Sequence, residues 1–270
     1  LKKVGGEANG REALQLLGEL AGRASQLAPR ERHDVARAGV ELFPAESVFL
    51  ELAADALSPE HDGAAMLADV HRRLAAQASA AGQSARERQA LEEVFKLREA
   101  GRAELDRLSV LRLEAGDRAG YMHAVLAWAS QADEEGLTDE AVERLTRLRD
   151  QMPQELEPRQ ALVGLHRRRR DTQSLTSELI GLGDMGMARR EFSRAELHFR
   201  EARQLRPDDP EILERLAQMG EERGLNEAAA IEYRRLADLL EKLGRLPEAL
   251  TACLRANELN SNDEAGLVQM

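Results

Sequence analysis

Residues 193–207 read SRAELHFREARQLRP, and this stretch decides the fold because similar stretches precede and follow it with a constant period of 54 along the chain. The earlier one is DEAVERLTRLRDQMP at 139–153, and the later one is PEALTACLRANELNS at 247–261. An alanine recurs at the same point in each stretch: Ala141, Ala195 and Ala249. Self-similarity at a constant period indicates a repeat architecture, in which one unit cannot bury its apolar face without its neighbours.

Three consecutive units, 83–136, 137–190 and 191–244, align without insertion or deletion. The equivalent apolar residues lie three or four positions apart within each segment, as one face of a helix requires. Examples are Leu108, Leu162 and Leu216, then Val125, Leu179 and Tyr233, and then Trp128, Leu182 and Leu236. The preceding segment, 29–82, shares chiefly its last helix with them.

Each unit reads as three helices, of which the third is the longest. The first ends before a proline such as Pro153 or Pro207, which cannot continue a helix. Gly116 and Gly224 follow the second helix and suit a left-handed C-cap. The pattern predicts about fourteen helices: 10–27, 31–42, 45–57, 62–81, 84–99, 103–115, 118–135, 138–150, 157–169, 172–189, 192–205, 210–222, 225–243 and 246–259.

The composition favours an all-α protein. Strong helix formers dominate the 270 residues, aromatic residues are 3%, and valine, isoleucine and threonine are sparse. The net charge of −11, with no basic domain, argues against a nucleic-acid partner and favours solubility. No apolar run approaches the ~20 residues that span a bilayer, so we expect no membrane insertion.

The ratio of arginine to lysine and the number of cysteines indicate the source of the protein and its compartment. Four lysines accompany 34 arginines, a ratio typical of GC-rich bacteria. The single cysteine, Cys253, favours a reducing compartment, and we therefore expect a cytoplasmic protein. The chain opens at Leu1 without a methionine and stops within a repeat, which predicts an excerpt of a longer protein.

Residues 176–209 resemble a tetratricopeptide repeat (TPR), a helix–turn–helix unit of about 34 residues. Segments 122–155 and 230–263 repeat the match. The residues that carry the repeat pattern are Trp128, Ala141, Leu182, Gly183, Ala195, Phe199, Ala202, Pro207, Tyr233 and Ala249. The copies recur with the longer period of 54 because one extra helix separates them, so the long third helix is expected to close one hairpin and open the next.

The resemblance implies a right-handed α-solenoid whose concave face binds a protein or peptide. We predict divergent repeats over 1–117, TPR-like repeats over 118–263 and a truncated end over 264–270, all in one continuous solenoid. The carboxylate-clamp mode of the family relies on lysine and asparagine, and this chain has almost no lysine. We expect a different mode of binding here.

Arg167, Arg168, Arg169 and Arg170 form the densest basic run, where the sister units read LEAG and EERG. One interpretation is a partner-binding patch for carboxylates, since guanidinium groups pair with them bidentately. The other is a solvated helix end, because cations suit a helix C-terminus.

The stretch 181–187, GLGDMGM, places three glycines inside a predicted helix. Close helix packing explains Gly183 best, whereas a bend or an adaptable methionine-lined surface is the alternative. Gly181 and Gly186 stay unexplained by the sequence. Trp128, Tyr121 and Tyr233 lie on the apolar stripe, so we interpret them as core rather than binding anchors.

The sequence contains no constellation that points to catalysis. The six histidines lack metal-ligand spacing, and neither a phosphate-binding glycine loop nor a nucleophile elbow occurs. We therefore expect no enzyme activity, no cofactor and no metal. The leading hypothesis is a non-catalytic scaffold that binds a partner protein or peptide. The alternative is a structural module that self-associates end to end through apolar helix faces.

Overall fold

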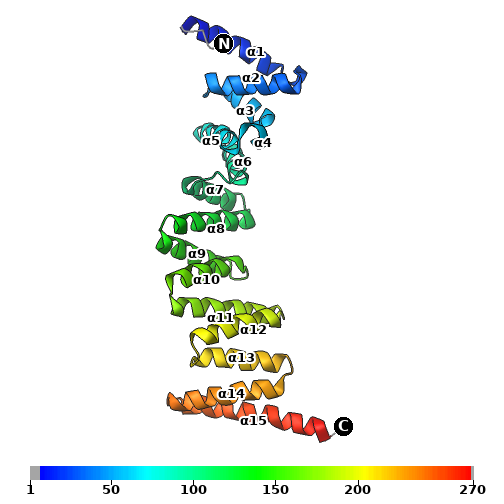
Figure 1. Cartoon of the computed structure of the whole chain (residues 1–270), viewed down its shortest axis with the longest axis vertical. Coiled ribbons are helices and arrows are strands. Elements are labelled where there is room, and N and C mark those ends of the chain that lie inside the picture. The colour runs from blue at the N-terminus through cyan, green and yellow to red at the C-terminus, as the bar shows by residue number, and fades with distance from the viewer. Residues whose placement is uncertain (1–6, 269–270) are drawn as a thin grey trace. The chain divides into compact units, whose positions relative to one another are not determined.

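The computed structural model describes residues 7–268, and all of their regular structure is helical (Figure 1). Side chains are described over residues 11–260. Fifteen α-helices and one short 3-10 turn, Ala24–Gln26, occur in this part of the chain. The predicted all-α class is confirmed.

The chain divides into two compact units, Leu1–Glu135 and Gly136–Met270. Unit 1 contains α1 (Glu7–Gly22), α2 (Pro29–Leu42), α3 (Ser47–Ala56), α4 (Pro59–Asp62), α5 (Ala64–Ala80), α6 (Ser84–Lys96), α7 (Arg102–Glu114) and α8 (Arg118–Glu134). Unit 2 contains α9 (Thr138–Gln151), α10 (Glu157–Arg169), α11 (Thr172–Ala188), α12 (Phe192–Leu205), α13 (Pro210–Glu222), α14 (Asn226–Lys242) and α15 (Leu246–Val268).

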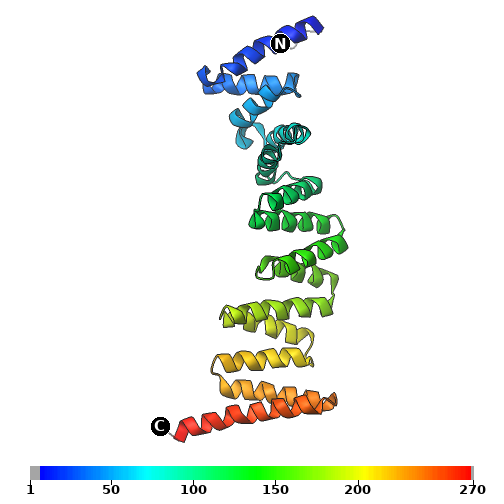
Figure 2. The same cartoon turned by 180° about the vertical axis from the view of Figure 1, so that it is seen from behind.

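Within each unit, helices pack mainly on their neighbours along the chain. In unit 2, each helix from α9 to α14 contacts the next one, and short turns reverse the direction of the chain between them (Figure 2). The apolar core is therefore divided into successive clusters. One cluster joins α10 to α13 around Phe199, and the next joins α13 to α15 around Tyr233. This nearest-neighbour packing defines a solenoid arrangement.

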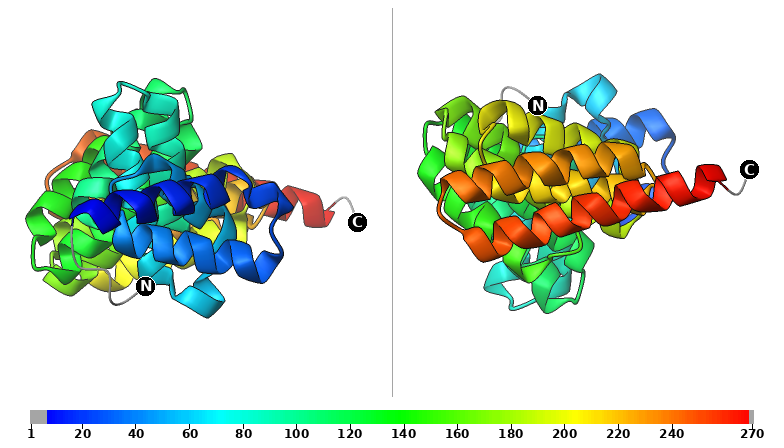
Figure 3. Two further views of the ribbon diagram at one scale, coloured as in Figure 1. Left: turned by 90° about the horizontal axis from the view of Figure 1, so that it is seen from above. Right: turned by 90° about the horizontal axis from the view of Figure 1, so that it is seen from below.

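The long helices of unit 2 pack on the helix before and the helix after them. α14 contacts both α13 and α15, and it lies alongside α15 in the right panel of Figure 3. α11 contacts α10 and α12 in the same way. The shorter helices α12 and α13 pack on two neighbours in the same way, so the sharing of one long helix by two TPR-like hairpins stays a prediction.

Residues with left-handed backbone angles end most of the helices. One series is Gly82, Gly136, Arg190 and Gly244, and the other is Gly116, Arg170 and Gly224. The left-handed conformation predicted for Gly116 and Gly224 is confirmed, with φ of 75° and 71°. Arginine replaces glycine at one place in each series, although a Cβ disfavours this conformation.

The helix boundaries differ from prediction chiefly in three places. The expected helix 10–27 ends at Gly22, and the 3-10 turn Ala24–Gln26 follows it. The expected helix 62–81 is divided at Gly63, whose φ of 87° separates the short α4 from α5. The last helix extends to Val268 instead of residue 259 and thus runs into the predicted end segment 264–270, of which 269–270 lie outside the described residues. The boundary between the compact units falls at Glu135, and the division into divergent repeats over 1–117 and TPR-like repeats over 118–263 stays a prediction.

Candidate functional site

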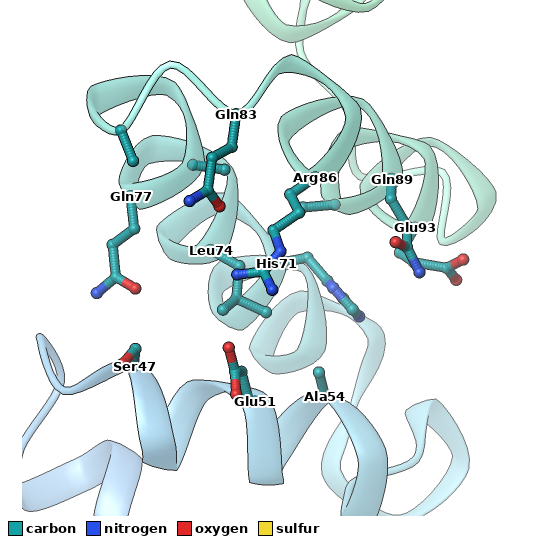
Figure 4. Close-up of a pocket in the computed structure, with 13 residues that line it drawn as sticks. Ser47, Glu51, Ala54, His71, Leu74, Gln77, Gln83, Arg86, Gln89 and Glu93 are labelled. Atoms are coloured by element: carbon teal, nitrogen blue, oxygen red, sulfur yellow. The ribbon is translucent and has the colours of Figure 1, made fainter.

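A groove in unit 1 lies between α3, α5 and α6 and has a volume of about 570 Å³ (Figure 4). Eight of its thirteen lining residues are polar: Ser47, Glu51, His71, Gln77, Gln83, Arg86, Gln89 and Glu93. Small or apolar side chains complete the lining: Ala54, Leu74, Ala78, Ala81 and Ala90. The groove therefore combines hydrogen-bonding walls with alanine-lined space.

Helical periodicity brings these side chains to the groove. Ser47, Glu51 and Ala54 are spaced by four and three residues, so they share one face of α3. His71, Leu74 and Ala78 have the equivalent spacing on α5. Arg86, Gln89 and Glu93 stand in the same relation on α6, and the three faces meet because α5 packs on both α3 and α6.

The electrostatics of the groove are mixed. Burial lowers the pKa of His71 below its ordinary value; Glu93 opposes this effect and Lys96 adds to it. The imidazole is therefore neutral at pH 7 and offers one donor and one acceptor. Glu93 Oε1 lies 2.6 Å from Lys96 Nζ. Glu51 on α3 points toward the wall that carries His71 and Arg86 (Figure 4).

Three glutamines, Gln77, Gln83 and Gln89, supply hydrogen-bonding amide groups to the groove. Gln77 Nε2 already donates a hydrogen bond of 2.8 Å to the carbonyl oxygen of Ala45, at the edge of the groove. Glutamine carries both donors and acceptors, so each of the three amides can hydrogen-bond to polar groups of either kind. The set is suited to recognition by hydrogen bonding rather than to bond cleavage.

The sequence interpretation missed this groove. The segment 29–82 shares chiefly its last helix, α5, with the other repeats, so the alignment gives no equivalent of α3 and no indication that α3 faces α5 and α6. One signal was present: Gln83, Arg86, Gln89 and Glu93 recur at helical spacing as a polar face on α6. In the sequence, this polar face cannot be distinguished from a solvent-exposed helix surface. Only the structure shows that α3 forms the opposite wall.

The arginine run 167–170 occupies the last turn and C-cap of α10. Arg167 Nη2 lies 2.5 Å from Glu201 Oε1, and Arg169 Nη1 lies 2.6 Å from Asp139 Oδ1. Arg170 adopts the left-handed conformation, with φ 57°. At least two of the four guanidinium groups therefore pair with carboxylates inside unit 2, and the partner-binding role of the run stays a prediction.

The Arg167 ion pair has a counterpart of opposite polarity. The pair links α10 to α12, and one period further along the chain Glu221 of α13 pairs with Arg255 of α15. The carboxylate and the guanidinium have exchanged helices, while the geometry of the link is kept. This repetition favours a structural role for Arg167 in holding neighbouring helices together.

The glycine-rich stretch of α11 lies against three different partners. A Cβ on Gly183 would meet the Phe199 ring at 2.3 Å, and one on Gly186 would meet Ala195 at 3.1 Å. A Cβ on Gly181 would meet the guanidinium of Arg159 at 2.5 Å. All three glycines therefore allow close contacts with neighbouring groups, which supplies the reason for Gly181 and Gly186 that the sequence lacked.

The remaining repeat positions contribute to the core. Trp128 and Tyr233 are buried, and Tyr121 is half-buried. Ala141, Leu182, Ala195, Phe199, Ala202 and Ala249 are buried as well, whereas Pro207 is exposed in the turn after α12.

Two further tests concern metals and membranes. Among the described residues, no group of three or more His, Cys, Asp or Glu side chains is placed to hold a metal ion. None of the described helices combines the length and apolar character that crossing a bilayer requires.

His166 lies at the position of Arg112 and Gly220 in the sister units. It is buried, and burial lowers its pKa.

The helices and their packing define an all-α solenoid arrangement within each unit. No family model matches the chain, and no curated protein matches it by sequence. A similar solved structure is the crystal structure of the APC/C hetero-tetramer Cut9–Hcn1, with 10% identity and a TM-score of 0.29. The match covers 92% of this chain and 51% of the other, so the chain spans about half the length of that protein chain.

Proposed function

We propose that this protein is a non-catalytic scaffold that binds a partner protein or peptide, and that the groove between α3, α5 and α6 forms part of the binding surface. The observation that carries the proposal is the lining of that groove, in which amide, imidazole and charged side chains face one cavity of about 570 Å³. A rigid array of helices holds these groups in place before binding, which reduces the entropy cost of association.

The finer features of the proposal extend the sequence interpretation. Binding on the concave face of a right-handed solenoid remains a prediction. A repeat period of 54 is supported by the two series of left-handed residues, which recur at that interval from 82 to 244 and from 116 to 224. The excess of arginine over lysine and the single cysteine support a bacterial, cytoplasmic protein.

Site-directed photo-crosslinking tests the groove. A photo-reactive amino acid at Gln83, on the groove, should capture a discrete polypeptide from a cell lysate. The same group at Glu60, which is exposed on α4 in the same unit, serves as the matched control. Arg86→Glu should reduce the capture at position 83. Equal capture from both positions, or no capture at all, would contradict a binding role for the groove.

Self-association is the second candidate function. It is favoured by leucines that are more than 40% exposed on α1, Leu16 and Leu20, and by three others on α15, Leu246, Leu250 and Leu254. Light scattering over a concentration series tests it. A mass that stays at that of one chain at high concentration would exclude this role.

A further inference from the structure

The walls of the groove in unit 1 carry two charges of opposite sign that the protein does not neutralise. Glu51 stands on α3 and Arg86 stands on α6, and both side chains point into the groove (Figure 4). No ion pair among the described residues includes either of them, so they do not pair with each other. The groove therefore offers one carboxylate and one guanidinium to an incoming ligand.

Most other charged side chains of α3, α5 and α6 are paired within the fold. Arg72 of α5, for example, pairs with Glu104, and Glu87 of α6 pairs with Arg107. In these three helices, all of which the structure describes, Arg88 is the one further charged residue without an ion pair, and it does not line the groove. The open charges of Glu51 and Arg86 are thus a feature of the groove rather than of the helices in general.

A buried imidazole lies in the same groove without a hydrogen-bond partner. His71 is 9% exposed, and its ring makes no hydrogen bond to any described residue. Its ring nitrogens nevertheless stay accessible from the groove that it lines. Buried polar groups are normally hydrogen-bonded, so this imidazole points to a ligand that supplies the missing partner.

The space between the two charges is apolar, since Ala54, Leu74 and Ala78 line it. The aliphatic stem of a lysine or arginine can lie along such a surface while its charged head reaches a carboxylate. A guanidinium pairs bidentately with a carboxylate, which suits Arg86 to an acidic side chain. A ligand charge of the wrong sign at either position would be repelled.

We propose that the groove recognises a partner segment that presents a basic side chain to Glu51 and an acidic side chain to Arg86, with an uncharged hydrogen-bonding group at His71. The proposal rests on the scaffold function and deepens it, because it names the chemistry of the bound segment. Charge complementarity at an open site decides which sequence binds more than how tightly it binds, because exposed ion pairs contribute little free energy.

Selection from a random peptide library at pH 7 measures this sequence preference on the full chain. The unchanged protein should enrich peptides with one basic and one acidic residue at a constant spacing. Glu51→Lys should replace the basic residue of the enriched peptides by an acidic one and keep the other. Arg86→Glu should replace the acidic residue by a basic one.

Two control variants alter charges outside the groove. Arg88→Glu matches Arg86→Glu, because Arg88 lies on the same helix and also has no ion pair. Glu60→Lys, on α4 in the same unit, matches Glu51→Lys. Both controls should enrich the same peptides as the unchanged protein. None of the four positions is buried, so all variants should fold, and circular dichroism verifies this.

Synthetic versions of the enriched peptides give the size of the effect. Each groove variant should bind the original peptide about tenfold more weakly, as measured by fluorescence anisotropy. A peptide with the corresponding charge reversed should restore the affinity. Local unfolding of a variant would not allow this rescue.

The outcomes separate this inference from the scaffold function. Enriched peptides that lack the two charges, or whose charges stay the same in both groove variants, would overturn the inference and leave the groove as a binding surface. Equal changes in the groove variants and the controls would overturn it too, as would a library in which no peptide is enriched. Crosslinking at Gln83 then decides separately whether the groove binds a partner protein.

Discussion

At the residue scale, single side chains set how closely the helices approach. Gly183 and Gly186 of α11 lie against Phe199 and Ala195 of α12. At the position where α7 has Arg112, the sister helices have His166 and Gly220, and all three residues are buried. The larger Arg112 is accommodated because Gly120 lies beside it, and its Nη1 donates to the Gly120 carbonyl oxygen at 2.8 Å. The core therefore tolerates different residues where neighbours compensate for volume.

Gly183→Leu should lower the melting temperature by about 5–10 °C. The Phe199 ring stands 2.3 Å from the site of the new Cβ, and overpacking of this kind costs about 2–3 kcal/mol. Gly164→Ala on α10 is the matched control, because its Cβ would meet nothing closer than Arg168 at 3.8 Å. That control should melt at the same or a higher temperature, since alanine favours the helix. Scanning calorimetry measures both, and an unchanged melt for Gly183→Leu would exclude close packing.

Arg170→Gly should stabilise the protein by about 1 kcal/mol, because it relieves a left-handed residue that carries a Cβ. Its sister positions, Gly116 and Gly224, already contain glycine. Arg189→Gly is the control: Arg189 has φ −88° and donates a hydrogen bond to the Gln154 carbonyl oxygen, so this change should destabilise. Urea unfolding compares the two variants. A loss of stability in Arg170→Gly would show that the Arg170 side chain contributes to the fold.

At the element scale, ion pairs link helices that are adjacent along the chain. Arg107 of α7 donates two hydrogen bonds of 2.7 Å, from Nε and Nη2, to the buried carboxylate of Glu87 on α6. Glu178 of α11 accepts from Arg149 and Arg159 and thereby ties three helices together. Helix propensity forms these helices, and the ion pairs help to fix their register.

The Glu87 link predicts a dependence of stability on pH. The hydrogen bonds from Arg107 hold the pKa of Glu87 below its ordinary value of 4.5. The stability that Glu87 contributes is therefore complete above the unfolded-state pKa and lost as pH falls through the lower folded-state pKa. Glu87→Gln should cost about 1–2 kcal/mol at pH 7 and reduce the loss of stability between about pH 5 and pH 3.

Urea unfolding of both proteins across this pH range measures the difference. Glu143→Gln serves as the control, because its carboxylate pairs with Arg147 on the exposed surface of α9, and exposed pairs contribute little. Parallel curves for Glu87→Gln and the unchanged protein would refute the assignment.

Capping shows how far local sequence signals reach. Asp117 and Asp209 cap α8 and α13 through their carboxylates. For α11 the cap is Asp171 and not the following Thr172, and the Asp171 carboxylate accepts from the Ser174 N–H at 3.1 Å. Asp171 and Thr172 are both suitable N-cap residues. The conformation of the preceding turn decides which of them caps the helix, and the sequence spacing does not specify that conformation.

At the scale of the whole molecule, each unit is a succession of local clusters rather than one central core. Such arrays tolerate removal of a complete repeat, because each helix needs only its neighbours. Deletion of residues 137–190, one proposed repeat, joins Gly136 to Glu191 and gives α12 the place in the chain that α9 holds one period earlier. The shortened chain should keep its helicity per residue and unfold cooperatively.

Deletion of residues 157–190 is the control for the deletion of a complete repeat. It removes α10 and α11, a segment as long as an ordinary TPR unit, and it joins α9 directly to α12. This shorter deletion should lose cooperativity, since two helices of the same type become neighbours. Circular dichroism and thermal melts compare the two proteins. Equal behaviour would contradict the three-helix repeat.

The sequence by itself determined the all-α class, most helix positions and the glycine turns, because helix formation and capping depend on residues a few positions apart. It also predicted close helix packing at Gly183, and the structure places the Phe199 ring there. The tertiary structure alone decided the groove between α3, α5 and α6, the position of Arg159 over Gly181, and the exposure of Leu246, Leu250 and Leu254 on α15. These features depend on side chains from different helices, distant along the chain, that meet only when the helices pack. A polar or apolar stripe looks the same in the sequence whether or not another helix covers it.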